Sequence, residues 1–243
     1  MPILEGKGVT KYFGGLAAVS NVDFTVEQGE AFGLIGPNGA GKTTLFNLIS
    51  AALTTQSGSI IFKGQDITRK KHYQICRLGI ARTFQTVKIF ADLPVISNVM
   101  LGSYFGISRG MSSADAVRKA SEILEFVGLG RWKEAPAKDL TLANQKRLEV
   151  GRALATQPEL LLLDEIMAGL TSTEVGDAME LIDRIRHKGI TIIMIEHVMK
   201  AIMNVSDRIM VLHHGEKIAQ GTPQEIATSE KVIEVYLGEK RHA

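Results

Sequence analysis

The nine residues GPNGAGKTT, at positions 36–44, constrain the fold more than any other part of the chain. Glycine occupies the first and sixth positions, lysine and threonine follow, and the apolar run AFGLIG leads into the stretch. Glycines let the backbone curl so that successive N–H groups point into one concave surface, which suits phosphate oxygens. Helical apolar spacing then runs from Lys42 to about Ser50. The stretch therefore predicts a buried strand, a phosphate-binding loop and a helix.

The residue types of this loop predict a nucleoside triphosphate as its ligand. The Lys42 ammonium would reach the β- and γ-phosphates, and the Thr43 hydroxyl would bind Mg²⁺. The start of the following helix adds the positive end of its dipole. A glycine-rich turn without a ligand is the alternative, but the strand before and the helix after give a nucleotide loop its expected context. The residues expected to contact nucleotide are Gly36, Pro37, Asn38, Gly39, Ala40, Gly41, Lys42, Thr43 and Thr44.

Strand and helix patterns alternate through the rest of the chain, which favours a mainly parallel α/β sheet covered by helices on both faces. The residue patterns are helical from 87 to about 157. We therefore expect one domain, 1–243, with a nucleotide-binding core (1–86 and 158–243) and an inserted helical subdomain (87–157). The strand patterns are VDFTVEQ, GSIIFKG, LGIARTFQ, ELLLLDE and GITIIMIEH. Three helices are expected from apolar spacing and caps. One has Val117, Ala120, Leu124 and Val127 on one face and ends at Gly128, and another has Val175, Met179, Ile182 and Ile185 on one face. The third lies in the tail and starts at Thr222 and Pro223.

Composition excludes several classes of protein. The net charge is +2, too balanced for an electrostatic nucleic-acid binder. The chain has one cysteine, Cys76, and so no internal disulfide. The first residues, MPILEGKGVTKYFGG, lack the apolar core of a signal peptide, and no apolar run is long enough to cross a membrane. We expect any service to a membrane to go through a partner.

Polar side chains end several of the expected strands. Asp164 and Glu165 close LLLLDE, where Asp164 could hold Mg²⁺ and Glu165 could polarise an attacking water. Glu196 and His197 close the strand in MIEHV, and His197 could reach the γ-phosphate. Gln85 ends ARTFQ, and its amide could bind Mg²⁺ or orient water. Taken singly, each is more often an ordinary strand end; together with the phosphate loop they predict a hydrolytic site.

These motifs, in this order and spacing, resemble those of the ATP-binding cassette (ABC) ATPases. The resemblance covers essentially the whole chain and includes the segment LTLANQKRLEVGRAL. It implies the ABC-ATPase form of the P-loop NTPase fold, with an antiparallel N-terminal β region beside the parallel core. The segments ARTFQ, ATQPELLLLDE and HHGEKIAQGTPQEI are similar to those of branched-chain amino acid importer ATPases.

The resemblance also assigns roles to residues. Phe13 would stack on adenine, although a half-buried aromatic at a strand end is the plain alternative. Gln85 would be the Q-loop glutamine and His197 the switch histidine, both acting in catalysis with Glu165 and Lys42. Mg²⁺ would be held by Thr43, Gln85 and Asp164.

The family signature LSGGQ is replaced here by LTLAN, residues 140–144. In the family this segment binds the γ-phosphate held by a second protomer. We expect a helix N-terminus in which Thr141 is the cap and Thr141, Ala143 and Asn144 face the partner's nucleotide through backbone N–H groups. The Ala143 methyl would loosen this fit. A decayed, non-hydrolysing site is the competing interpretation.

A second departure follows Glu165. Ile166 stands where the family has proline, and Thr171 where it has the aspartate that ends the D-loop. Loss of that charge predicts weaker communication between the two ATP sites of a dimer.

The resemblance implies a peripheral ATPase on the cytoplasmic face of a membrane, driving an importer for branched-chain amino acids or related small amides and acids. Its cofactors would be ATP and Mg²⁺. Its partners would be permease subunits, a second ABC ATPase and, indirectly, a solute-binding protein, with no nucleic acid. The alternatives are the ATPase of a lipid or lipopolysaccharide exporter, a soluble ABC protein of repair or translation, and a binding module without turnover.

Overall fold

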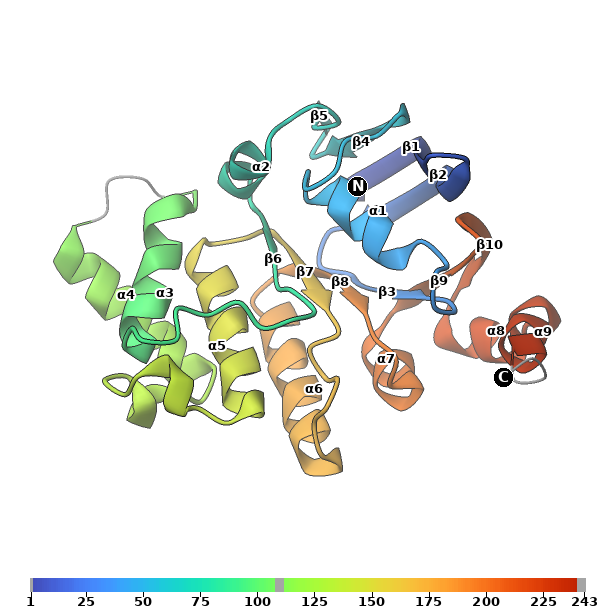
Figure 1. Ribbon diagram of the computed structural model, residues 1–243. Coiled ribbons are helices and arrows are strands. Elements are labelled where there is room, and N and C mark those ends of the chain that lie inside the picture. The colour runs from blue at the N-terminus through green and yellow to red at the C-terminus, as the bar shows by residue number, and fades with distance from the viewer. Residues whose placement is uncertain (1, 108–111, 240–243) are drawn as a thin grey trace.

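Two β-sheets stack with one helix between them in the computed structural model, which describes residues 2–107 and 112–239 (Figure 1). The first sheet is antiparallel, with order β2-β1-β4-β5. The second has order β10-β9-β3-β8-β7-β6 and is parallel except for the β9–β10 pair. The strands are β1 (Pro2–Phe13), β2 (Leu16–Glu27), β3 (Ala31–Ile35), β4 (Ser57–Phe62), β5 (Gln65–Asp66), β6 (Ile80–Arg82), β7 (Leu160–Asp164), β8 (Thr191–Ile195), β9 (Arg208–His213) and β10 (Glu216–Gly221).

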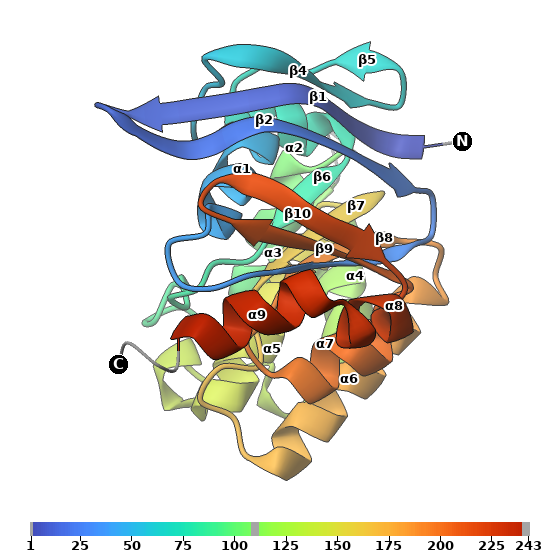
Figure 2. The same ribbon diagram turned by 90° about the vertical axis from the view of Figure 1, so that its right-hand side faces the viewer.

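Helices cover both faces of the parallel sheet. Helix α1 lies between the two sheets, whereas α5, α6 and α7 cover the opposite face (Figure 1). Helices α8 and α9 lie beside β9 and β10 (Figure 2). The helices are α1 (Lys42–Ile49), α2 (His72–Leu78), α3 (Val95–Phe105), α4 (Ser113–Phe126), α5 (Leu142–Ala155), α6 (Ser172–Arg186), α7 (Met199–Val205), α8 (Pro223–Thr228) and α9 (Glu230–Glu239), with 3₁₀ turns η1 (Gly130–Trp132) and η2 (Ala137–Asp139).

The parallel strands are buried on both faces, which explains their continuous apolar sequences. Side chains on one face of the sheet, such as Phe32 and Leu162, pack with α1 and the antiparallel sheet. Side chains on the other face, such as Leu161 and Met194, pack with the helices below. The parallel strands therefore form the shared wall of two apolar cores.

The mixed α/β fold and the antiparallel N-terminal region are confirmed. The expected helix after the phosphate loop spans Lys42–Ile49, and Thr222 caps α8 with Pro223 in its first turn. Gly128 adopts a left-handed φ of +79° just past the end of α4, as its expected capping role requires.

Two expectations are wrong in detail. Val117 is 43% exposed, because α4 turns Ala116, Ala120 and Leu124 inward instead. The strand in LGIARTFQ covers only Ile80–Arg82, because Leu78 ends α2 and Gly79 takes a left-handed conformation. Gln85 therefore lies in a loop three residues past the strand end.

Residues 87–157 contain α3, α4 and α5, which pack on one another beside the parallel sheet. Residues 108–111 of this range lie outside the described part of the chain. Among the described helices, none is long and apolar enough to cross a lipid bilayer.

Candidate functional site

A hollow of about 420 Å³ lies where the loop after β3 meets the ends of the neighbouring strands. Most of the phosphate loop lines it, so the loop and the strand-end side chains come together as predicted. Sequence reasoning did not foresee the contributions of β2 and of His214. The lining residues are Phe13, Leu16, Ala17, Ala18, Asn38, Gly39, Ala40, Gly41, Lys42, Thr43, Thr44, Gln85, Glu165, His197 and His214.

Close backbone packing fixes the shape of the phosphate loop. Gly36 and Gly41 have φ values of +149° and +102°. A Cβ atom at Gly36 would lie 2.1 Å from the Leu212 carbonyl oxygen, and one at Gly41 would lie 2.2 Å from that of Ala18. Only glycine fits at these two positions, and the loop is therefore held against β2 and β9.

The Lys42 ammonium lies within the loop. It donates to the carbonyl oxygens of Gly36 (2.6 Å) and Pro37 (2.8 Å). Gly36 and Pro37 do not line the hollow. They take part in the site through these carbonyl oxygens, which hold the Lys42 ammonium. The N-terminus of α1 opens towards the hollow with Lys42, Thr43 and Thr44, and backbone N–H groups at the start of a helix suit phosphate oxygens.

Three side chains from separate elements meet at the rim of the hollow. The Gln85 amide donates to Glu165 Oε2 (3.0 Å), and His197 Nε2 lies 2.8 Å from Glu165 Oε1. Glu165 is a non-glycine residue with a left-handed φ of +52°. This turn directly after β7 separates the Glu165 side chain from that of Asp164, so both carboxylates lie near the loop but in different surroundings.

Asp164 is buried and does not line the hollow. Its Oδ2 accepts from Arg82 Nη2 (2.7 Å), while Oδ1 is buried and has no hydrogen-bond partner among the described residues. Burial raises the pKa of Asp164, although the Arg82 guanidinium opposes the shift. An unsatisfied buried carboxylate oxygen is a position that a hydrated cation could satisfy. Mg²⁺ prefers oxygen ligands, and Thr43, Gln85 and Asp164 all offer oxygen donors, but only Thr43 and Gln85 line the hollow.

Phe13 lies at the end of β1 on the rim of the hollow and is 49% exposed. The Lys11 ammonium lies 5.5 Å from its ring centroid. The ring is therefore open to a ligand in the hollow, as stacking on a base would require.

The segment 140–144 forms the start of α5 and does not line this hollow. Thr141 is the N-cap, and its hydroxyl accepts from the Asn144 N–H (3.4 Å), as predicted. Ala143 is only 8% exposed, so its methyl faces its own chain more than the surface. Contact of Thr141, Ala143 and Asn144 with nucleotide would require a second molecule.

Two buried charges near the site were missed by sequence reasoning. Lys146, 7% exposed, donates to the carbonyl oxygens of Glu165 (2.9 Å) and Ala168 (2.7 Å). Glu196, 3% exposed, accepts from the Met167 N–H (2.9 Å). Lysine in a polar helix and glutamate at a strand end give no sequence signal for burial.

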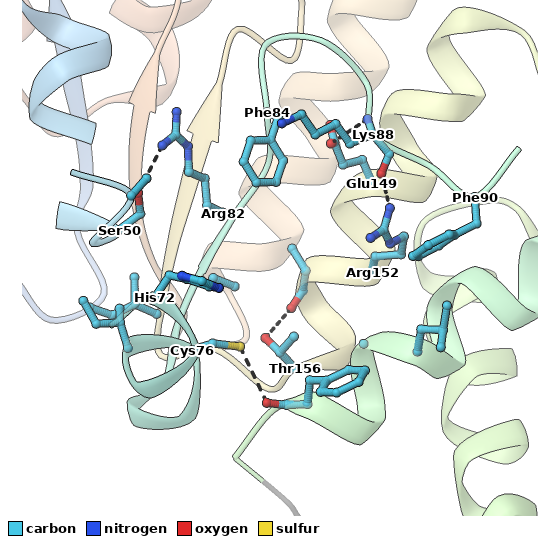
Figure 3. A pocket seen from close by; sticks show the side chains of 18 residues that line it. Ser50, His72, Cys76, Arg82, Phe84, Lys88, Phe90, Glu149, Arg152 and Thr156 are labelled. Carbon is cyan, nitrogen blue, oxygen red and sulfur yellow. Dashed lines mark hydrogen bonds between the residues drawn. The ribbon is translucent and has the colours of Figure 1, made fainter. Parts of the chain in front are cut away.

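A second hollow, also of about 420 Å³, lies between α2, β6, the loop after β6, α3 and α5 (Figure 3). Aromatic rings and cations alternate along it. The Lys88 ammonium lies 4.5 Å from the Phe84 ring centroid, and the Arg152 guanidinium lies 5.0 Å from that of Phe90. Glu149 Oε1 accepts from the Lys88 N–H (3.2 Å), and burial raises the pKa of this carboxyl. Because the loop 83–90 also carries Gln85, it touches both hollows.

Known proteins share the sequence and the fold of this chain. The sequence model described as ABC transporter matches residues 19–168, and one described as branched-chain amino acid ATP-binding cassette transporter matches residues 216–242. The high-affinity branched-chain amino acid transport ATP-binding protein LivG of Escherichia coli (strain K12) is 39% identical over 251 residues, covering 98% of each chain.

Two solved structures share the fold. The ADP conformation of MJ1267, an ATP-binding cassette of an ABC transporter, has a TM-score of 0.88 and 33% identity and covers 98% of this chain and 99% of its own. A dimeric post-hydrolysis state of the ATP-binding cassette MJ0796, bound to ADP and Pi, has a TM-score of 0.82 and 25% identity and covers 90% of this chain and 98% of its own. With its phosphate loop and strand-end carboxylates, the chain belongs to the ABC transporter family and is an ATPase.

Proposed function

We propose that this chain is the ATP-hydrolysing subunit of an importer for branched-chain amino acids or related small amides and acids. The likeness to LivG over nearly the full length supports the solute class. The observation that carries the catalytic part is the Glu165 carboxylate, held between Gln85 and His197 at the rim of the phosphate-loop hollow.

The hydrolysis follows from these positions. The loop N–H groups and the Lys42 ammonium bind the β- and γ-phosphates, and Phe13 stacks on adenine. Glu165 accepts a hydrogen bond from the attacking water and orients it. Water oxygen bonds to the γ-phosphorus as the bond to the ADP oxygen breaks, and ADP and inorganic phosphate leave. His197 lies where it can steady both Glu165 and the γ-phosphate.

Thr43, Gln85 and Asp164 would hold Mg²⁺. The bound ion supplies positive charge that offsets the negative charge of the phosphate oxygens. Arg82 holds one oxygen of Asp164, so Oδ1, which has no hydrogen-bond partner among the described residues, is the oxygen that would hold the ion or a water bound to it.

Two copies of an ABC cassette would complete each ATP site. The tip of α5, with Thr141, Ala143 and Asn144, does not reach the hollow of its own chain. We propose that it closes over the nucleotide of a second, identical or paralogous ATPase. The dimeric MJ0796 structure shows that related cassettes assemble in pairs.

A permease segment would dock in the second hollow (Figure 3). The rings of Phe84, Phe90 and Phe105 are exposed there, at 39%, 48% and 65%. Beside them lie the cations Lys88 and Arg152. A helix with an apolar face and one or more carboxylates matches this surface, and the solute-binding protein would act through the permease. This arrangement keeps the ATPase peripheral, on the cytoplasmic face of the membrane.

The helical subdomain of residues 87–157 would then link permease binding to ATP hydrolysis. It carries one wall of the second hollow and the tip of α5, whereas the core (1–86 and 158–243) carries the phosphate loop and Glu165. Movement of the subdomain relative to the core would couple permease binding to closure around ATP.

The test is Glu165→Gln, which keeps the size of the side chain but removes its charge. We expect ATP turnover to fall by about 10²-fold or more and an ATP-bound dimer to accumulate, as measured by phosphate release and light scattering. Glu180→Gln, on the exposed face of α6, is the matched control and should behave as the unchanged protein. Monomer alone in saturating ATP would refute the paired mechanism, and undiminished turnover would refute the role of Glu165.

A further inference from the structure

The turn that follows Glu165 has an unusual backbone and needs external support. Glu165 adopts a left-handed φ of +52°, a conformation that L-residues other than glycine rarely keep unless their surroundings enforce it. Its N–H donates to the Ile195 carbonyl oxygen (2.9 Å), and its own carbonyl oxygen accepts from the Ala168 N–H (3.2 Å). The direction of the Glu165 side chain depends on this turn.

Lys146 supports the turn from α5. Its buried ammonium donates to two carbonyl oxygens of the turn, those of Glu165 (2.9 Å) and Ala168 (2.7 Å). Hydrogen bonds from a charged donor to carbonyl groups in a buried setting are stronger than those between neutral groups. Lys146 thus fixes both ends of the four-residue turn with one side chain.

Glu196 supports the same turn from β8. Its Oε1 accepts from the Met167 N–H (2.9 Å), and its Oε2 is buried without a hydrogen-bond partner among the described residues. Burial raises its pKa to about 7, against the attraction of the Lys146 ammonium. Glu196 directly precedes His197, whose ring meets Glu165 from the other side. The turn is therefore held from two sides by the buried Lys146 and Glu196, which the proposed chemistry does not use.

We propose that Lys146 and Glu196 are positioning residues that hold the turn Glu165–Ala168, and that Lys146 ties Glu165 to the tip of α5. This inference rests on the proposed role of Glu165. Lys146 is five residues beyond Thr141, or about 7 Å along the helix axis. A displacement of α5 caused by nucleotide bound opposite Thr141 would therefore reach the Glu165 carbonyl through one rigid turn of helix and one ammonium.

If the two buried residues only stabilised the fold, substituting them would have a different effect. Their loss would lower the melting temperature and the affinity for ATP together. Loss of a positioning pair should lower kcat while the KM and Kd for ATP change little, because the phosphate loop itself is untouched. The ratio between kcat and KM effects therefore separates the two roles.

The experiment compares Lys146→Met, Lys146→Arg and the matched control Lys138→Met, which removes an exposed lysine paired with Asp92. We expect Lys146→Met to lower kcat about tenfold or more, with the Kd for ATP changed less than about threefold. Lys146→Arg can still donate to both carbonyls and should recover most of the rate. Full kcat in Lys146→Met, or equal losses in kcat and ATP affinity that arginine does not rescue, would overturn the proposal.

Glu196 gives a second test should Lys146→Met fail to fold. Glu196→Gln keeps an acceptor for Met167 and should retain more of the rate than Glu196→Leu, which has none. Unchanged kcat in a folded Glu196→Leu protein would contradict the proposal.

The double variant Glu165→Gln/Lys146→Met separates this inference from the proposed function. Its turnover should equal that of Glu165→Gln, because Lys146 acts through Glu165. An inactive Glu165→Gln beside a fully active Lys146→Met would defeat only the positioning role. An active Glu165→Gln would defeat the proposed function itself.

Discussion

The phosphate-loop hollow and the second hollow have similar volumes but differ in construction. The phosphate-loop hollow is formed largely by backbone and small residues, and two glycines hold its loop against β2 and β9. The second hollow is formed by large side chains, with aromatic rings beside cations (Figure 3). A backbone cradle recognises a group common to all nucleotides, whereas a side-chain surface can be tuned to one partner. The difference suits an ATPase whose fuel is constant and whose proposed permease partner is specific.

The largest effect is expected from a substitution that disturbs the backbone packing of the phosphate loop. Gly41→Ala places a methyl 2.2 Å from the Ala18 carbonyl oxygen, in addition to the strain of a φ of +102°. The loop must shift, so we expect ATP affinity to fall by about 100-fold, or roughly 3 kcal/mol. Isothermal titration with ATP measures it.

Gly189→Ala is the matched control, since Gly189 also has a positive φ (+81°) but open space around its Cβ position. It should lose about 1 kcal/mol of stability through backbone strain and no ATP affinity. If Gly41→Ala bound ATP normally, the cradle would not depend on close backbone packing.

A second prediction concerns the buried charge behind the first hollow. The pKa of Glu196 in the fold is about 7, above its ordinary value of 4.5, so the folded state holds its proton to higher pH than the unfolded state. Stability is therefore lost as pH rises from about 4.5 to about 7. Glu196→Gln removes this loss, so between pH 4.5 and pH 8 the free energy of unfolding should fall by about 3 kcal/mol less in the variant than in the unchanged protein.

Denaturant unfolding at both pH values checks this difference. Lys146, Glu165 and the backbone N–H groups of Met167 and His197 face Glu196, and together with burial they set its pKa. An identical pH dependence in the two proteins would show that Glu196 is already ionised in the fold well below pH 7.

A third prediction tests the side-chain construction of the second hollow. Lys88→Glu reverses an exposed charge 4.5 Å from the Phe84 ring centroid. We expect association with the permease to weaken about tenfold, or roughly 1.4 kcal/mol, while ATP binding by the isolated chain is unchanged. Detergent-solubilised permease titrated with the two proteins gives the affinities.

Lys188→Glu provides the control for that experiment. Its ammonium also lies 4.5 Å from an aromatic centroid, that of Phe126, but outside the second hollow. Equal weakening by both substitutions would indicate a general charge effect and would remove the second hollow as the docking surface.

The same contrast explains which parts of the site could be predicted from the sequence. Most of the phosphate loop, Glu165 and His197 line one hollow, because a local motif and strand ends at one sheet edge determine their positions, whereas Asp164 is buried and does not line it. The second hollow was not foreseen, since its walls come from α2, the loop 83–90, α3 and α5. Nor was the Arg82–Asp164 pair, or the burial of Lys146, because each depends on contacts between distant segments. The exposure of Val117 shows that helical spacing fixes a face only to within one residue.

The smallest expected effect concerns the departure at Thr171, the N-cap of α6. Thr171 caps α6 with Glu174 in a reciprocal arrangement, so its exposed hydroxyl already has a structural role. Thr171→Asp keeps a good N-cap and adds the charge typical of the family. We expect ATP turnover and its dependence on protein concentration to rise a fewfold, or roughly 0.5–1 kcal/mol, because the two sites of the dimer would communicate better. Thr222→Asp makes the same change at the cap of α8 and should leave turnover unaltered. If Thr171→Asp also left turnover and its concentration dependence unaltered, the missing charge would not limit coupling, and the link through Lys146 would be the stronger candidate for communication between the sites.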